Sequence, residues 1–226
     1  MENNKDYHEW LEKIIKDGME LKYVPEDMRT YELCEIAVKN DGWALEFVPV
    51  ELKSRELCEL AVKQDVSGYA MAYVPEELKT KEFCEMVVKS HGFTLAYVPK
   101  ELRTPELCEL AIKGVLGQGG NLQFAPYELR TQELCEIAVK DKGYALEHVP
   151  EELKTLEMCE YAVSRDGYNL EFVPNEFRTF QICDVALQNV FKGRVDKVLN
   201  AFVPEEFHKE LAEKYYIDLP EKGKGR

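Results

Sequence analysis

Residues 29–49 read RTYELCEIAVKNDGWALEFVP and span one repeating unit of this chain. The Val48-Pro49 dipeptide at the end of the stretch recurs from Val24 to Val203, and Ala125-Pro126 takes its place once. Successive copies lie 24, 26, 24, 27, 24, 24 and 30 residues apart. A period of this kind is typical of repeat architectures, whose units bury their apolar faces against their neighbours. The sequence therefore predicts a base unit of 24 residues with insertions of two, three and six residues.

The first half of the unit has the signals of a helix. Thr30 is placed to accept a hydrogen bond from an unpaired amide at a helix N-terminus, and Glu32 lies in the first turn, where the helix dipole favours an acid. The same capping position is held in the other units by Ser54, Thr80, Thr104, Thr131, Thr155 and Thr179. We expect a helix of about eleven residues that ends at Gly42, because glycine tolerates the positive φ found at many helix ends. The glycines expected to do the same elsewhere are Gly68, Gly92, Gly143 and Gly167.

The second half of the unit alternates an aromatic residue, a leucine and a second aromatic residue, as in Trp43, Leu45 and Phe47. Pro49 limits this element, because the residue before a proline disfavours the helical conformation. The pattern fits either a short regular helix or two irregular turns. The repeat as a whole predicts an all-α fold, an α-solenoid of about eight short helix-pair repeats.

We predict one repeat domain over residues 1–218. Its expected parts, in chain order, are an N-terminal cap unit (1–24), regular repeats (25–190) with insertions near 65–68, 114–120 and 190–199, and a C-terminal cap (200–218). A disordered tail is expected over residues 219–226.

All seven cysteines occupy one position of the repeat, four residues after the capping residue: Cys34, Cys58, Cys84, Cys108, Cys135, Cys159 and Cys183. Cysteine behaves as a small, buried hydrophobe, so we interpret the column as core packing between close helices. Stacked helices lie about 8–10 Å apart, beyond the roughly 7 Å between Cα atoms that a disulfide allows. The sequence also lacks the close Cys/His pairs of zinc sites. We therefore expect no disulfide, metal or cofactor.

The chain has 43 acidic and 29 basic residues and a net charge of −14. This balance argues against binding to nucleic acid or to an anionic membrane, both of which select basic surfaces. The N-terminal sequence has no signal-peptide pattern, and no apolar run is long enough to span a bilayer. We expect a cytoplasmic protein, and a monomer is favoured.

A basic column follows an acidic one at a distance of two residues, as in Arg29 after Asp27. The basic residues are Arg29, Lys53, Lys79, Arg103, Arg130, Lys154 and Arg178. One interpretation is an ion ladder between units. The other is a basic stripe that binds an acidic partner.

Residues 37–63, AVKNDGWALEFVPVELKSRELCELAVK, resemble the repeat of the domain-of-unknown-function 4116 family, whose units read approximately A-V-x-x-x-G-x-x-L-x-x-x-x-x-x-L. The resemblance covers most of residues 19–190 and departs from the family pattern at Gly114–Gly120, at Val190–Leu199 and in the uniform Cys-Glu pair. It implies a helical-repeat fold and supplies no catalytic residues.

The sequence has no catalytic constellation outside the repeat. His148 lies in the aromatic ladder, where a buried or half-buried packing role is expected. The stretch GVLGQGG, Gly114–Gly120, lacks the Lys-Ser/Thr ending of a phosphate-binding loop, so we interpret it as an irregular connection.

We therefore predict a non-enzymatic protein-protein interaction module, a scaffold or adaptor with an unidentified protein partner. The alternative is an acidic inhibitor or nucleic-acid mimic that blocks a basic groove of a target enzyme. The position after each capping residue varies between units, so it is free to carry recognition. The predicted partner-binding residues are Tyr31, Arg55, Lys81, Gln132, Leu156 and Phe180. Of these, Tyr31, Leu156 and Phe180 are expected to be exposed anchors, the residue types found at interface centres.

Overall fold

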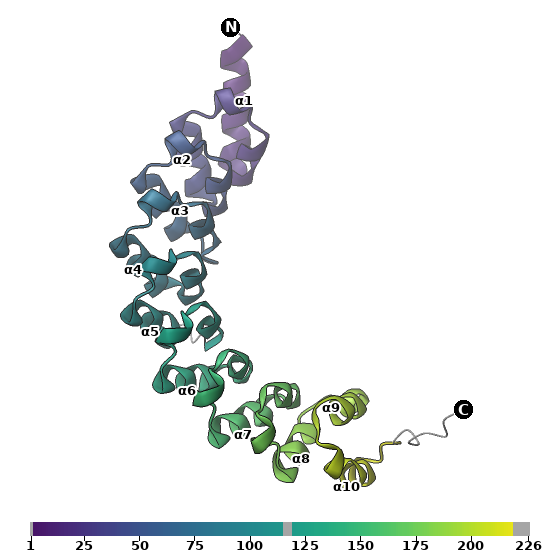
Figure 1. The fold of residues 1–226 in the computed structure, drawn as a ribbon. Helices are drawn as coiled ribbons and strands as arrows, with labels where there is room; N and C mark the ends of the chain where they lie inside the picture. Colours follow the sequence, from purple (N-terminus) through teal and green to yellow (C-terminus); the bar gives the residue numbers. More distant parts are fainter. Residues whose placement is uncertain (1, 115–118, 219–226) are drawn as a thin grey trace, which may run out of the picture. The chain divides into compact units, whose positions relative to one another are not determined.

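The computed structural model describes residues 2–114 and 119–218, and its contacts divide the chain into two compact units, Met1–Leu116 and Gly117–Arg226. Every regular element in the described residues is a helix (Figure 1), which confirms the predicted all-α repeat fold. The single domain predicted over residues 1–218 stays a prediction. The predicted tail, 219–226, lies outside the described residues, as do residues 115–118 of the expected connection at Gly114–Gly120.

The α-helices of the first unit are α1 (Glu2–Lys16), α2 (Tyr31–Asn40), α3 (Arg55–Gln64), α4 (Lys81–Ser90) and α5 (Pro105–Lys113). Those of the second unit are α6 (Gln132–Asp141), α7 (Leu156–Arg165), α8 (Phe180–Gln188), α9 (Val195–Phe202) and α10 (Glu205–Tyr215).

Short 3-10 helices follow the α-helices. Those of five or six residues are η1 (Gly18–Tyr23), η3 (Gly42–Phe47), η5 (Tyr69–Tyr73), η7 (Gly92–Tyr97), η9 (Gly119–Phe124), η11 (Gly143–His148) and η13 (Gly167–Phe172). Those of three residues are η2 (Glu26–Met28), η4 (Val50–Leu52), η6 (Glu76–Leu78), η8 (Lys100–Leu102), η10 (Tyr127–Leu129), η12 (Glu151–Leu153), η14 (Asn175–Phe177) and η15 (Lys192–Arg194).

The predicted helix starts are confirmed. Thr30 Oγ1 accepts a hydrogen bond from the Leu33 amide at 3.4 Å, and Ser54 Oγ accepts one from the Leu57 amide at 3.2 Å. The same capping bond is made by Thr80, Thr104, Thr131, Thr155 and Thr179. Helices α2 to α8 have nine or ten residues, close to the expected length.

The glycines after the α-helices have a different role from the one expected. Among the described glycines, Gly68 is the one with a positive φ, 76°. Gly42 instead begins η3, where a Cβ atom would come within 3.0 Å of the Ala61 carbonyl oxygen in the next repeat. Gly167 lies equally close to Ala186. The neighbouring helix therefore requires glycine at these two positions. The expected positive φ is wrong for Gly42, Gly92, Gly143 and Gly167.

The second half of the unit consists of two successive 3-10 helices. Asp41 caps η3, because its Oδ1 accepts a hydrogen bond from the Trp43 amide at 2.9 Å. Val48 ends η3 with extended dihedral angles, φ −72° and ψ 128°, as expected before a proline. Pro49 then begins the turn that forms η4.

The core of each repeat lies between its α-helix and its longer 3-10 helix. In one repeat it contains Leu33, Cys34, Ala37 and Val38 of α2 and Leu45 of η3, none of which has exposed surface. The seven cysteines are fully buried free thiols, so their predicted core role is confirmed. Small side chains at the Cys and Ala positions let α2 pack closely against its neighbours α1 and α3.

Two of the insertions have defined structures. After α3, the extra residues form a turn in which Gly68 takes the left-handed conformation just before η5. In the expected insertion at 190–199, the chain forms η15 and α9. The second half of this repeat is therefore an α-helix, where the other repeats have a 3-10 helix.

Candidate partner-binding surfaces

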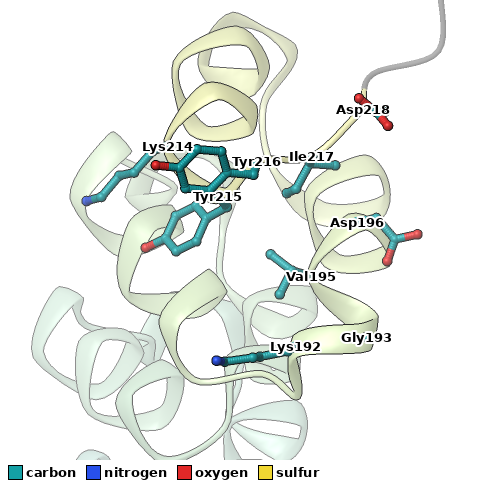
Figure 2. Close-up of a pocket in the computed structure, with 9 residues that line it drawn as sticks. All are labelled: Lys192, Gly193, Val195, Asp196, Lys214, Tyr215, Tyr216, Ile217 and Asp218. Atoms are coloured by element: carbon teal, nitrogen blue, oxygen red, sulfur yellow. The ribbon is translucent and has the colours of Figure 1, made fainter.

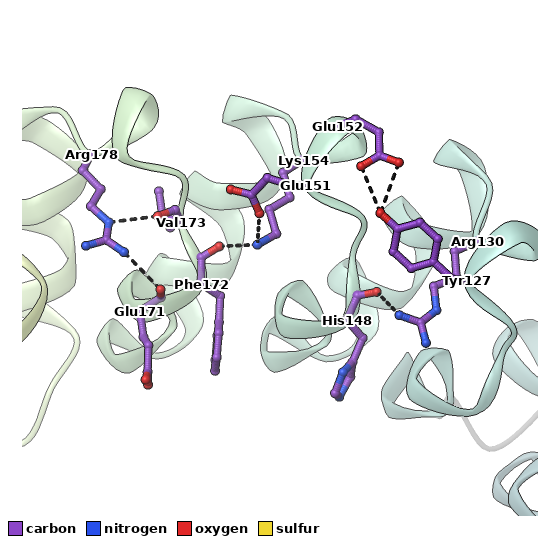
Figure 3. A network of polar contacts seen from close by, with 10 residues as sticks. All are labelled: Tyr127, Arg130, His148, Glu151, Glu152, Lys154, Glu171, Phe172, Val173 and Arg178. Carbon is purple, nitrogen blue, oxygen red and sulfur yellow. Dashed lines mark hydrogen bonds and ion pairs between the residues drawn. The ribbon is translucent and has the colours of Figure 1, made fainter.

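The basic column connects the carbonyl ends of successive 3-10 helices. Arg130 donates through Nε to the Ala125 carbonyl oxygen at 3.0 Å and through Nη1 to the His148 carbonyl oxygen of the next repeat at 2.7 Å (Figure 3). Arg178 makes the equivalent two bonds, both at 2.9 Å. The last carbonyl groups of a helix have no partner inside it, and these guanidinium groups provide one.

The ion ladder between units is therefore wrong for Arg29, Arg130 and Arg178, whose guanidinium groups bond backbone carbonyls. The other interpretation, a basic stripe that binds an acidic partner, stays a prediction. Lys154 also donates to a backbone carbonyl of the next repeat, that of Phe172, at 2.8 Å. Its ion pair is with Glu151, three residues earlier, at 2.9 Å. The positive charge of this column is used inside the fold.

His148 is half-buried, as expected for its place in the ladder. Burial lowers the pKa of its imidazole, and the nearby Arg130 acts in the same direction, against the opposing effect of Glu147. The neutral form of His148 is therefore favoured, which fits a packing role.

The predicted partner-binding residues are divided between the two units, with Tyr31, Arg55 and Lys81 in the first and Gln132, Leu156 and Phe180 in the second. The polar members bind residues of their own helices. Arg55 Nε bonds Glu59 at 3.0 Å, Lys81 Nζ lies 3.8 Å from Glu85, and Gln132 Nε2 bonds Glu136 at 3.0 Å.

The three apolar or aromatic members differ in exposure. Tyr31 and Leu156 are exposed, as expected. Phe180 is half-buried, and its ring centroid lies 5.7 Å from that of Phe207 in α10. The prediction of an exposed anchor is wrong at Phe180, because α10 provides a packing partner. Whether this column binds a protein stays a prediction.

A second surface, which we call the aromatic stripe, is formed in the first unit by Trp43, Tyr69, Phe93 and Tyr97. The ring centroid of Tyr69 lies 5.5 Å from that of Trp43, 5.1 Å from that of Phe93 and 6.4 Å from that of Tyr97. Trp43 is 37% exposed and Tyr69 is 46% exposed. The stripe therefore joins aromatic rings of three consecutive repeats into one partly exposed surface.

The indole of Trp43 is held by the turn after α3. Its Nε1 donates to Asp65 Oδ1 at 3.0 Å and to Ser67 Oγ at 3.1 Å. Asp65 is buried and also accepts a hydrogen bond from the Ala70 amide at 2.6 Å. Burial raises the pKa of Asp65, but hydrogen bonds from Ser67, Ala70 and Trp43 outweigh it and hold the pKa below its ordinary value. The turn after α3, which contains the two-residue insertion, thus fixes one end of the aromatic stripe.

The sequence contains a signal for this stripe. In η3, η5 and η7 the middle residues Leu45, Met71 and Leu95 are fully buried, and the rings flank them at two-residue steps. In each of these 3-10 helices the central aliphatic residue faces the core, and the aromatic residues two positions before and after it lie closer to the surface.

A cavity of about 710 Å³ lies near the C-terminal end of the second unit, between η15, α9 and the end of α10 (Figure 2). Lys214, on its rim, forms an ion pair with Asp184 at 2.7 Å. Tyr215 also donates to Asp184, at 2.7 Å, and burial together with this bond raises the pKa of its phenol to about 12. Figure 2 shows the carboxylates of Asp196 and Asp218 pointing away from the cavity, so its lining offers no convergent polar groups.

The buried thiols are poor nucleophiles, because burial raises the pKa of each of the seven to about 11. In the part of the chain that the structure describes, no group of three His, Cys, Asp or Glu side chains is arranged to hold a metal ion. None of the described helices has the length and apolarity needed to cross a membrane.

Comparison with known proteins gives one kind of match. The family described as "Domain of unknown function (DUF4116)" matches residues 11–53, 54–103, 106–154 and 131–178. Searches of curated proteins and of solved structures give no match. The four matched ranges cover well over half of the chain and coincide with the α-helix and 3-10 helix repeats. The chain therefore belongs to the DUF4116 family, whose repeat the sequence resembles.

Proposed function

We propose that this chain is a non-catalytic protein-binding module and that the aromatic stripe is its binding surface in the first unit. The observation that supports the proposal is the contact of Tyr69 with the rings of Trp43, Phe93 and Tyr97. Tryptophan and tyrosine are enriched among the residues that dominate binding energy in protein interfaces.

The arrangement of the stripe also favours binding. A side chain that is already held in one orientation loses less conformational entropy when a partner covers it. Trp43 is held by hydrogen bonds to Asp65 and Ser67, and Tyr69 packs against three rings.

The test is quantitative affinity capture from a cell extract with the full chain and two variants. Tyr69→Ala removes the central ring of the stripe. Tyr144→Ala is the matched control, because Tyr144 has the equivalent position in η11, is 50% exposed and has no ring partner among the described residues. We expect the same proteins with the wild type and with Tyr144→Ala, and a loss of one or more of them with Tyr69→Ala. Equal capture by all three would show that the aromatic stripe is not the binding surface.

Salt separates this proposal from the alternative, an acidic inhibitor or nucleic-acid mimic. Binding through aromatic rings should persist at about 0.5 M salt, because screening acts on charges and not on apolar contacts. A mimic that uses the net charge of −14 should lose its partner under the same conditions. Salt-sensitive capture that ignores Tyr69→Ala would favour the mimic.

A further inference from the structure

A second cavity of the second unit has a different character from the one in Figure 2. Its volume is about 530 Å³. It is lined by Arg165 at the end of α7, by Asp166, by Tyr168 of η13, by Asn189 to Phe191 after α8 and by Arg194 of η15. The cavity lies where the chain departs from the regular repeat, because Val190, Phe191 and Arg194 belong to the expected insertion at 190–199.

Two arginines with unused charge line this cavity. Arg165 and Arg194 are both exposed, and neither side chain has an ion-pair or hydrogen-bond partner in the described residues. This contrasts with Arg130 and Arg178, whose guanidinium groups bond backbone carbonyls. Asp166 also lines the cavity, and its Oδ1 accepts a hydrogen bond from the Tyr168 amide at 3.0 Å. The carboxylate keeps its negative charge, so it offsets one of the two arginines and leaves the lining with an excess of positive charge. A guanidinium group matches the oxygens of a carboxylate or phosphate with two parallel hydrogen bonds.

The hydroxyl of Tyr168 adds an unused polar group to the same wall. It is buried and has no hydrogen-bond partner, and in the described residues the His91 ring nitrogen Nδ1 is the other side-chain atom of this kind. Buried donors are almost always paired in folded proteins, so each exception needs an explanation. Because the hydroxyl is buried, a ligand oxygen becomes its partner only if side chains of the cavity wall move apart.

Phe191 supplies an apolar contact beside the charged groups. Its side chain is 85% exposed, an unusual state for a phenylalanine. We propose that this cavity binds a small organic anion, in which a carboxylate or phosphate meets Arg165 and Arg194 and an attached apolar group packs on Phe191. The proposal is independent of the aromatic stripe, which lies in the other unit.

The test is isothermal titration of the full chain with phenyl phosphate, benzoate and inorganic phosphate. We expect saturable one-to-one binding of phenyl phosphate or benzoate, and the stronger of the two identifies the oxyanion. Inorganic phosphate should bind roughly tenfold more weakly, because it lacks the apolar group. Phe191→Ala should remove this preference. Inorganic phosphate binding as well as phenyl phosphate would overturn the role of Phe191.

Arg165→Gln and Arg194→Gln should each weaken binding by roughly tenfold or more, because each removes charge-assisted hydrogen bonds. Arg55→Gln is the control, since that arginine is exposed, paired with Glu59 and located in the first unit. Tyr168→Phe should weaken binding without lowering the Tm of the free protein, because the hydroxyl has no partner to lose. A lower Tm would assign the hydroxyl a structural role.

The proposal fails if neither organic anion binds at concentrations up to about 10 mM, which is above the range of weak specific binding. It also fails if binding is unchanged in both arginine variants, because the anion would then occupy another place.

Discussion

Gly42 tests the close contact between neighbouring repeats. A Cβ atom at this position would lie within 3.0 Å of the Ala61 carbonyl oxygen, a backbone atom that cannot rotate away. Forcing extra volume into a packed interior costs about 1–3 kcal/mol. We expect Gly42→Ala to lower the free energy of unfolding by about 2 kcal/mol. For a unit of this size, that corresponds to a decrease in Tm of about 8 °C.

Two further glycines complete a graded series. At Gly143 an added Cβ would be 3.1 Å from the Asn169 side chain and 3.2 Å from the Ala162 carbonyl oxygen, so a small shift accommodates it. At Gly193 it would meet nothing within 4 Å. Gly143→Ala should therefore cost less than about 1 kcal/mol, and Gly193→Ala should change stability by no more than about 0.5 kcal/mol.

Thermal unfolding followed by circular dichroism at the helical band measures all three variants. Because repeat proteins can unfold in more than one step, the comparison uses midpoints of the same transition rather than a single free energy. The reasoning is refuted if Gly42→Ala and Gly193→Ala melt at the same temperature. It is also refuted if Gly193→Ala is the least stable of the three.

Four further predictions concern the thiols and the basic column. In the native state the seven buried cysteines should react slowly with a disulfide reagent and all react in denaturant, and rapid native labelling of most of them would contradict the buried core. Cys108→Ser should destabilise the protein by about 1–3 kcal/mol through an unpaired buried hydroxyl, more than Cys108→Ala, as measured by urea unfolding. Burial raises the pKa of the Cys108 thiol from 9.0 to about 11, so the folded state favours the neutral thiol. Its contribution to stability is therefore full below pH 9 and is lost as the pH rises to about 11, and the Tm should decrease over this range. Cys108→Ala should make the decrease in Tm shallower. Arg130→Met should lower the free energy of unfolding by about 1–3 kcal/mol, because the carbonyl groups of Ala125 and His148 lose their guanidinium donor. Arg130→Lys should lower it less, since Lys154 donates to a backbone carbonyl from the equivalent position of another repeat.

Features that depend on neighbours in sequence were predictable. The capping bond of Thr30 spans three residues, and each of the helices α2 to α8 has it. The burial of Cys34 follows from its place on the apolar side of a short helix. Eight approximate copies of one pattern also make the fold class recognisable, because each copy repeats the same signals.

Features that depend on the next repeat were not predictable from the local pattern. Gly42 reads as a helix end, but its small size is required by Ala61, 19 positions later in the chain. Arg130 reads as a surface charge, but its partner His148 belongs to the following repeat. Phe180 reads as a free first-turn residue, and only the fold shows that Phe207 packs against it. In each case the role of the residue depends on a side chain or backbone atom of another structural element.

The distribution of charge also bears on the organic-anion cavity. The chain has a net charge of −14, and this value already includes the arginines and lysines of the basic column. This net charge repels a free anion, although screening confines the repulsion to about 8 Å at physiological salt. Arg165 and Arg194 attract an anion only at short range. Inorganic phosphate gains little binding free energy beyond that attraction. An organic anion gains more, because its apolar group also contacts Phe191, and this contact does not depend on charge. The cavity should therefore discriminate between anions by their apolar group, and the preference for phenyl phosphate over inorganic phosphate should persist at salt concentrations that weaken the binding of both.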